Sequence, residues 1–240
     1  MPEIATATNI EHARRVREMF EGIAGRYDLL NHVLSGNVDK RWRRVLTERL
    51  SGVGVDQPVL DVACGTGDLS LELQQAGRTN VIGIDFCRPM LAIAKAKVGA
   101  KNVEIPFIQG DALNLPFDDG SIALVTIAFG LRNLSSVEHG IKELFRVLEP
   151  GGRLAVLEFS KPAVPVLSPI FRLYFSRVVP FLGGLISGSR SAYEYLPDSV
   201  RRFPDQKQLA GLISDAGFTE VSFENLTGGI AALHFGTRPV

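Results

Sequence analysis

The residues best able to do chemistry gather around a glycine-rich turn. The segment Leu60–Asp68 reads Leu-Asp-Val-Ala-Cys-Gly-Thr-Gly-Asp, an apolar run that breaks into glycines before a helical pattern. Such a turn lets backbone approach a ligand closely and can aim amide N–H groups at it. Eighteen residues after Gly67, a second apolar run ends in Asp85, whose carboxylate can accept hydrogen bonds from a ribose. The spacing indicates a ligand that contains adenosine.

Two further turns discriminate between adenosine cofactors. A dinucleotide-dependent dehydrogenase would place a third glycine where Ser70 stands. Here Gly110-Asp111-Ala112 instead follows the third apolar run, and Pro150-Gly151-Gly152 precedes the fifth. The combination favours S-adenosylmethionine.

The elements that must position these residues follow from hydrophobic periodicity. Strands are predicted at Val59–Ala63, Val81–Asp85, Val103–Gln109, Ile122–Ala128, Leu154–Glu158, Phe218–Glu224 and Ala231–Gly236, the last two forming a hairpin. Helices between them are indicated by Pro89 and by capping boxes at Ser135–Glu138 and Asp205–Gln208. We therefore expect an α/β fold with a seven-stranded, mostly parallel sheet and an antiparallel C-terminal strand.

Helical segments flank and interrupt this sheet. Residues 13–34 have an amphipathic helical pattern that Gly25 bends or ends, and a second helix is predicted at Val38–Leu50. Residues 161–204 form too long a segment for a simple connection and are interpreted as an inserted helical lid. We expect one domain over residues 1–240, divided into a helical cap (1–52), a cofactor-binding core (53–160), the lid (161–204) and a C-terminal helix with hairpin (205–240).

Composition excludes several classes of protein. Lys plus Arg and Asp plus Glu both number 26, so no overall field exists to hold nucleic acid. Cys64 and Cys87 lack the paired spacing of a zinc site, no cluster of ligands at metal spacing is visible, and no metal is expected. No signal sequence is recognised, and no apolar stretch approaches the roughly 20 residues that cross a bilayer. A reduced, cytoplasmic setting fits best.

At this level of detail the sequence resembles the class I S-adenosylmethionine-dependent methyltransferases, which have a Rossmann-like fold. Within them it is similar to the C-methyltransferases of menaquinone and ubiquinone biosynthesis. The similar segments cover nearly the whole chain from about residue 13, and include Phe20–Asn31, Leu60–Asp68, Leu115–Phe117, Phe129–Asn133, Arg146–Leu154, Leu157–Pro162, Pro204–Gln206 and Ala232–His234. Phe-Gly-Leu-Arg-Asn and Leu-Glu-Phe-Ser-Lys-Pro are the most specific of them.

The resemblance implies particular cofactor residues. Thr66, Asp85, Asp111 and Ala112 match family positions, and Gly65 and Gly67 belong to the glycine turn. Ala128 departs from the family, which often has a serine there, so a hydroxyl contact is lost and only its backbone stays a candidate. The implied reaction joins a hydroquinone ring carbon to the sulfonium methyl after a neighbouring ring hydroxyl loses its proton, and it leaves S-adenosylhomocysteine.

Asp68, Arg132 and Asn133 are the catalytic candidates, because they belong to matched motifs at the ends of the first and fourth predicted strands. Each has a structural alternative: a carboxylate at a helix N-terminus, a surface salt bridge and a strand terminus, respectively. Tyr27 is expected to pack in the apolar stripe of the cap rather than to touch substrate, and His32 is expected to be structural.

The substrate implied by the resemblance is a polyprenyl hydroquinone. Demethylmenaquinol is favoured over 2-methoxy-6-polyprenyl-1,4-benzoquinol, and one enzyme could serve both pathways. The alternatives are methylation of another amphipathic small molecule, a non-catalytic cofactor-binding subunit and, as the weakest, a nicotinamide-dependent reductase.

An apolar segment and a basic segment could each contact a partner, and each has more than one interpretation. The apolar side chains between Phe171 and Leu182 suit a substrate entrance, core packing or a homodimer interface. The basic residues around Trp42 suit either an anchor at the anionic inner face of a membrane or a solvated helix face with a docked tryptophan, and the second is favoured.

Overall fold

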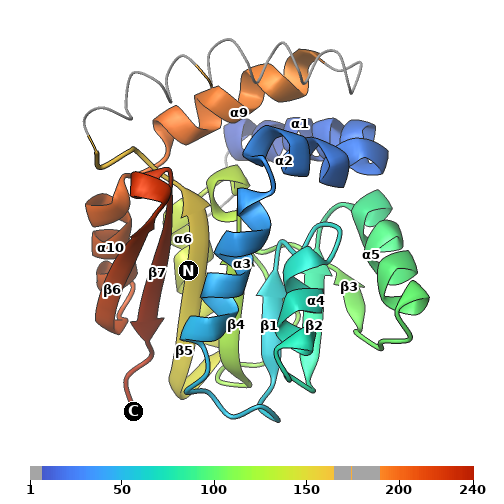
Figure 1. The fold of residues 1–240 in the computed structure, drawn as a ribbon. Coiled ribbons are helices and arrows are strands. Elements are labelled where there is room, and N and C mark those ends of the chain that lie inside the picture. The colour runs from blue at the N-terminus through green and yellow to red at the C-terminus, as the bar shows by residue number, and fades with distance from the viewer. Residues whose placement is uncertain (1–6, 165–173, 175–189) are drawn as a thin grey trace.

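A single seven-stranded sheet organises the protein in the computed structural model, which describes residues 7–164, 174 and 190–240 (Figure 1). Its strands are β1 (Val59–Val62), β2 (Val81–Asp85), β3 (Phe107–Gln109), β4 (Ile122–Ala128), β5 (Leu148–Phe159), β6 (Thr219–Leu226) and β7 (Ala231–Thr237). The spatial order is β3-β2-β1-β4-β5-β7-β6, and β7 runs antiparallel to both of its neighbours. The other neighbouring strands are parallel, so the predicted fold class is confirmed.

Both faces of the central strands are buried, because their side chains alternate between two apolar clusters. On one face Val59 and Leu124 pack with α3 (Val38–Arg49), α4 (Asp68–Gln75) and α5 (Arg88–Ala100). On the other face Leu60 and Val125 pack with α6 (Val137–Val147) and α10 (Gln206–Asp215). Near-continuous apolar strands are typical of a parallel sheet covered on both sides.

Helices at the N-terminus and in the insertion lie over the carboxyl ends of the parallel strands (Figure 1). The N-terminal pattern forms α1 (Ala7–Ile23), the 3-10 turn η1 (Ala24–Arg26) and α2 (Tyr27–Ser35), so the predicted break at Gly25 is confirmed. Helix α9 (Arg190–Arg202) packs against α1. The apolar segment at 171–182, for which an entrance, core packing and a homodimer interface are the alternatives, lies outside the described residues, apart from Tyr174.

Three predicted boundaries were wrong. The third strand is limited to Phe107–Gln109, directly after Pro106, which has no backbone N–H to donate to a ladder. The fifth begins at Leu148, which already pairs with Ile122 before the Pro-Gly-Gly segment interrupts the register. Ser136, not Ser135, caps α6 and accepts from the amide of His139. The capping box at Asp205 and Gln208 is confirmed.

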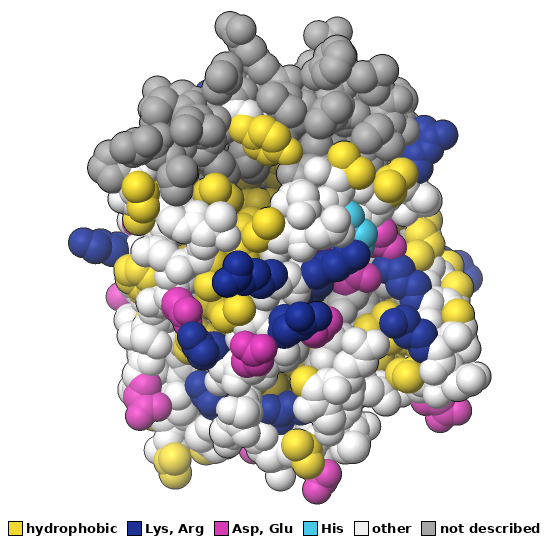
Figure 2. Space-filling model, in the orientation of Figure 1, with side chains coloured by type: hydrophobic (Ala, Val, Ile, Leu, Met, Phe, Trp, Pro, Cys, Tyr) yellow, Lys and Arg dark blue, Asp and Glu magenta, His cyan; other side chains and the backbone are white. Residues whose placement is uncertain are grey.

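Trp42 is docked in the interior. Its side chain is 4% exposed, its Nε1 donates to Thr227 Oγ1 at 2.8 Å, and its ring packs beside Phe129 and Phe159. Around α3, Lys and Arg side chains are interspersed with Asp and Glu at the surface (Figure 2). The predicted docking of the tryptophan is confirmed, and Lys40 and Arg44 are exposed as expected, but Arg43 is buried and pairs with Asp39. Across the described ranges, no helix is long and apolar enough to cross a bilayer.

Candidate active site

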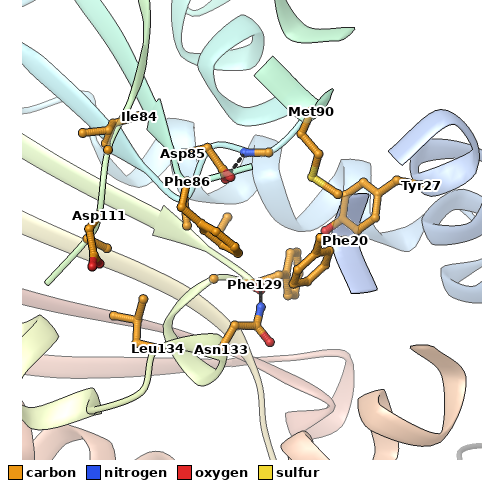
Figure 3. A pocket seen from close by; sticks show the side chains of 16 residues that line it. Phe20, Tyr27, Ile84, Asp85, Phe86, Met90, Asp111, Phe129, Asn133 and Leu134 are labelled. Atoms are coloured by element: carbon orange, nitrogen blue, oxygen red, sulfur yellow. Dashed lines mark hydrogen bonds between the residues drawn. The ribbon is translucent and has the colours of Figure 1, made fainter. Parts of the chain in front are cut away.

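A cavity lies under the cap at the carboxyl ends of the central strands (Figure 3). Five of the predicted site residues line it, namely Gly65, Asp85, Asp111, Ala112 and Asn133. The other lining residues are mainly apolar: Phe20, Tyr27, Ala63, Ile84, Phe86, Met90, Gly110, Ala128, Phe129, Gly130 and Leu134. Thr66, Gly67, Asp68 and Arg132 are not among them. The cavity therefore joins the ends of β1, β2 and β4 to the two cap helices.

The glycine turn is built on left-handed backbone. Ala63, Gly65 and Gly67 have φ values of 51°, 55° and 79°, a region that glycine enters without steric cost. A Cβ on Gly67 would also lie 2.9 Å from the ring of Phe107, which explains the need for glycine there. The expectation that the turn aims its amides at a ligand is wrong for both glycines, because Gly65 N donates to Asp85 and Gly67 N donates to the carbonyl of Cys64.

Asp85 closes the cavity at the end of β2. Its two carboxylate oxygens accept from the amides of Gly65 and Cys87, each at 2.8 Å. Burial raises the pKa of Asp85, while these amide hydrogen bonds oppose the rise. A carboxylate has about four acceptor sites, so each oxygen can still accept from a ligand hydroxyl. Asp111 adds a second carboxylate, which accepts from the amide of Leu113 at 2.9 Å.

An ionic cluster connects the glycine turn to the cap. Lys97 Nζ lies 2.7 Å from Asp68 Oδ1 and 2.5 Å from Asp28 Oδ2. Arg43 lies 3.2 Å from the other oxygen of Asp68. The hydroxyl of Thr66 donates to Asp28 Oδ1 at 2.5 Å. The structure therefore places Thr66 and Asp68 beside the cavity, with their polar atoms engaged by residues of α2, α3 and α5.

The segment after β4 has a strained backbone that gathers side chains. Phe129 has a φ of 56°, uncommon for an aromatic residue and typical of functional sites. In this conformation its carbonyl accepts from Arg132 Nη1 at 2.5 Å and from Asn133 Nδ2 at 3.2 Å. Arg132 and Asn133 lie in the 3-10 turn η2 (Leu131–Asn133). One carbonyl therefore orients both predicted catalytic residues of this segment.

Arg132 forms a buried ion pair, so the surface salt bridge is wrong as an alternative. Its Nη1 lies 2.7 Å from Glu158 Oε1, with the two side chains 7% and 1% exposed. The guanidinium lies over the ring of Phe159 at 5.4 Å, and its buried Nε has no hydrogen-bond partner among the described residues. Burial raises the pKa of Glu158, and the charge of Arg132 opposes that rise. A buried N–H without a partner is costly and uncommon in folded proteins, so it marks this turn as a site of interest.

Sequence reasoning missed some residues of the site. Tyr27 lines the cavity, although it was expected only to pack, and burial raises the pKa of its hydroxyl. Glu158 lies in the matched segment Leu157–Pro162 without a predicted role, although a charged residue at the end of a buried apolar strand is a usable signal. His32 contacts Asp39 at 3.0 Å and is not a lining residue, in keeping with a structural role.

Comparison with solved structures agrees with this architecture. A possible histamine N-methyltransferase from Thermotoga maritima, described as S-adenosylmethionine-dependent, matches with a TM-score of 0.68 at 18% identity, over 93% of this chain and 99% of that one. The [4+2]-cyclase SpnF matches with a TM-score of 0.71 at 18% identity, over 95% and 96% of the two chains. The protein therefore has the fold of the class I S-adenosylmethionine-dependent methyltransferases.

The sequence assigns the family within this class. A profile of the ubiE/COQ5 methyltransferase family matches residues 7–238, and the chain belongs to that family. A demethylmenaquinone methyltransferase from Thermus thermophilus is 51% identical over 92% of this chain and 100% of its own length. A ubiquinone/menaquinone biosynthesis C-methyltransferase UbiE from Cellvibrio japonicus is 42% identical over 95% of this chain and 93% of its own.

Proposed function

We propose that this protein methylates a ring carbon of demethylmenaquinol to give menaquinol, with S-adenosylmethionine as the methyl donor. The observation that carries the proposal is the 51% identity to a demethylmenaquinone methyltransferase over that relative's whole length. A second candidate substrate is 2-methoxy-6-polyprenyl-1,4-benzoquinol. It is supported by the 42% identity to a relative whose name covers both quinone pathways.

The cavity residues fit the proposed cofactor. Asp85 offers acceptor oxygens for ribose hydroxyls, and Gly65 brings backbone rather than a side chain to the cavity wall. Asp111 and Ala112 follow β3 and combine a polar with an apolar contact for the base, while Ile84 adds a flat apolar wall. When bound, S-adenosylmethionine supplies an electrophilic methyl group, and S-adenosylhomocysteine is left after transfer. In this proposal Thr66 and Gly67 shape the turn rather than line the cavity.

Arg132 and Asn133 are proposed to activate the acceptor. A ring hydroxyl must lose its proton before the neighbouring carbon becomes a strong nucleophile, and a fixed positive charge favours the resulting oxyanion. Asn133 lines the cavity and is suited to donate to that oxygen, whereas Arg132 does not line the cavity and is proposed to contribute its positive charge from η2, where it shares the carbonyl of Phe129 with Asn133. The hydroxyl proton passes to water, and the carbon that gains the methyl group later loses its own proton to water. Asp68 is proposed to hold the cap, because Lys97 and Arg43 already engage its carboxylate.

The test is methyl transfer from labelled S-adenosylmethionine to chemically reduced demethylmenaquinone, run in parallel with reduced 2-methoxy-6-polyprenyl-1,4-benzoquinone. The product is identified by mass, and we expect one added methyl group on the ring of demethylmenaquinol. Transfer only to the benzoquinol would replace the first substrate by the second. Tight binding of S-adenosylhomocysteine with no transfer to either acceptor would reject both and favour a non-catalytic subunit.

A further inference from the structure

A tyrosine from the insertion contacts the turn that carries Arg132 and Asn133. Tyr195 lies on α9, and its hydroxyl donates to Asn133 Oδ1 at 3.2 Å, although the two residues are 62 positions apart in the chain. On its other side, the ring of Tyr195 lies 6.5 Å from that of His12 on α1. The contact therefore links the insertion, the cap and η2 at one side chain.

The carbonyl of Phe129 sets which end of the Asn133 amide faces which partner, and the Tyr195 hydroxyl holds the other end in place. A side-chain amide fits a site in two orientations that exchange its oxygen and its nitrogen. The carbonyl of Phe129 can only accept, and it is 3.2 Å from Asn133 Nδ2, so the nitrogen must face Phe129 (Figure 3). The oxygen then faces the hydroxyl of Tyr195, which donates to it.

In this orientation the amide keeps an N–H donor for the cavity. Asn133 lines the cavity, its oxygen is taken by Tyr195, and one of its two N–H groups is taken by Phe129. The second N–H is the donor that Asn133 can still offer, while its oxygen, which faces Tyr195, keeps one lone pair. A donor stabilises an oxygen that carries negative charge, whereas an amide oxygen in the same place would repel it. The orientation of the amide therefore decides whether Asn133 helps or hinders an oxyanion.

Tyr195 is suited to be the permanent donor of this pair. Burial raises the pKa of its hydroxyl, so the group keeps its proton at neutral pH. Leu196 and Val200 of the same helix pack in an apolar cluster with Ile23 of the cap, which fixes the position of α9. A tyrosine has few rotatable bonds, so a ring held in this way directs its hydroxyl at little cost in entropy.

We propose that Tyr195 is a positioning residue that orients the Asn133 amide so that its free N–H donates to the reacting oxygen of the quinol. This inference rests on the proposed function, because it takes a quinol oxygen as the acceptor. It assigns a role in the reaction to the insertion, through a residue that no sequence motif indicated.

The test compares Tyr195→Phe in two backgrounds. Tyr195→Phe keeps the ring and removes only the hydroxyl, so kcat/KM for demethylmenaquinol should fall roughly three- to tenfold, the value of about one hydrogen bond. The Kd of S-adenosylhomocysteine should stay within about twofold. Because Tyr195 acts through Asn133, adding Tyr195→Phe to Asn133→Ala should cause no further loss, and such a cycle isolates the interaction of the two side chains.

Ser199→Ala is the matched control. Ser199 lies one turn further along α9, and its hydroxyl donates to the carbonyl of Leu196 at 2.9 Å within the helix. This variant removes a hydroxyl hydrogen bond from the same helix without touching Asn133, so kcat/KM should stay within about twofold of wild type. An equal loss of kcat/KM in Ser199→Ala and Tyr195→Phe would overturn the proposal. So would a loss of kcat/KM from Tyr195→Phe that is as large in the Asn133→Ala background as in wild type.

A second readout needs no turnover. In protein labelled with ¹⁵N-asparagine, the side-chain NH₂ signals of Asn133 are assigned by their loss in Asn133→Ala. Tyr195→Phe should shift these signals, and Ser199→Ala should leave them in place. Unchanged signals in Tyr195→Phe would overturn the positioning role. If wild type methylates neither quinol, the proposed function fails, while the NMR comparison still decides whether Tyr195 orients Asn133.

Discussion

The hydroxyl of Thr66 donates a 2.5 Å hydrogen bond to Asp28 Oδ1, and this bond joins the glycine turn to cap helix α2. The other oxygen of Asp28 lies 2.5 Å from Lys97 of α5. Phe20 and Tyr27, on the same side of the cap, line the cavity. Asp28 therefore holds the cap helix that carries the aromatic lining residues against the glycine turn on the other side of the cavity.

Asp28→Asn should weaken cofactor binding. The variant keeps an oxygen for the Thr66 hydroxyl but loses the charge that pairs with Lys97, so the cap should open more often. We expect the Kd of S-adenosylhomocysteine, measured by calorimetry, to rise roughly three- to tenfold through faster dissociation, a loss of about 0.5–1.5 kcal/mol. Glu18→Gln, which breaks an exposed ion pair with Arg14, should leave the Kd unchanged. Equal effects of the two variants would contradict the role of Asp28.

Asp85 and Arg132 should separate cofactor binding from turnover. Asp85→Ala removes the proposed ribose acceptor, and we expect the Kd of S-adenosylhomocysteine to rise about tenfold or more. Arg132→Lys keeps a positive charge beside Glu158 but loses the planar fork, so kcat should fall about ten- to a hundredfold with the Kd nearly kept. Lysine is preferable to alanine there, since Arg132→Ala would leave the buried Glu158 without its partner. A similar loss of cofactor affinity in both variants would refute this division.

The sheet could be predicted because its signal is local. Each central strand is a short apolar run, and a covered parallel sheet requires little more than such runs alternating with helices. Strand ends were less predictable, since Leu148 pairs with Ile122 through a register that no periodicity encodes. The shift of the α6 cap from Ser135 to Ser136 is similar, because two adjacent serines offer the same chemistry.

The residues of the candidate site also differ in how far the sequence predicts them. Asp85 could be found from the sequence because it ends a strand, and strand ends of such sheets meet at one edge. The pairing of Arg132 with Glu158, 26 positions apart, depends on β4 and β5 being neighbours. The contact of Tyr195 with Asn133 depends on how the insertion folds back. Contacts of this kind have no spacing rule, so the sequence supplied the residues without their partners.

Trp42 provides an internal probe, because it is the single tryptophan of the chain. Its indole is 4% exposed and hydrogen-bonded to Thr227, so its emission should be shifted to shorter wavelength than that of free tryptophan. Vesicles of anionic phospholipid should leave the emission unchanged, since the ring is already buried in protein. A further blue shift on adding vesicles would indicate that α3 inserts into lipid, contrary to the docked position of the ring.

Asp61→Asn should change how stability depends on pH. Asp61 is buried, accepts from the hydroxyls of Ser70 at 2.6 Å and Thr126 at 3.1 Å, and has its pKa raised by burial from 3.8 to about 7. Between these values the folded protein binds more protons than the unfolded chain, so this group lowers stability as pH rises from about 4 to 7. The hydroxyls can rotate to accept from an amide, so asparagine should be accommodated without that penalty.

The measurement is urea unfolding at pH 5 and at pH 8. Between these two pH values, wild type should lose stability relative to Asp61→Asn. Glu104→Gln, at an exposed site, is the control, and its stability should depend on pH as that of wild type does. If the stability of Asp61→Asn showed the same pH dependence as wild type, Asp61 would be ionised over the whole range from pH 5 to pH 8.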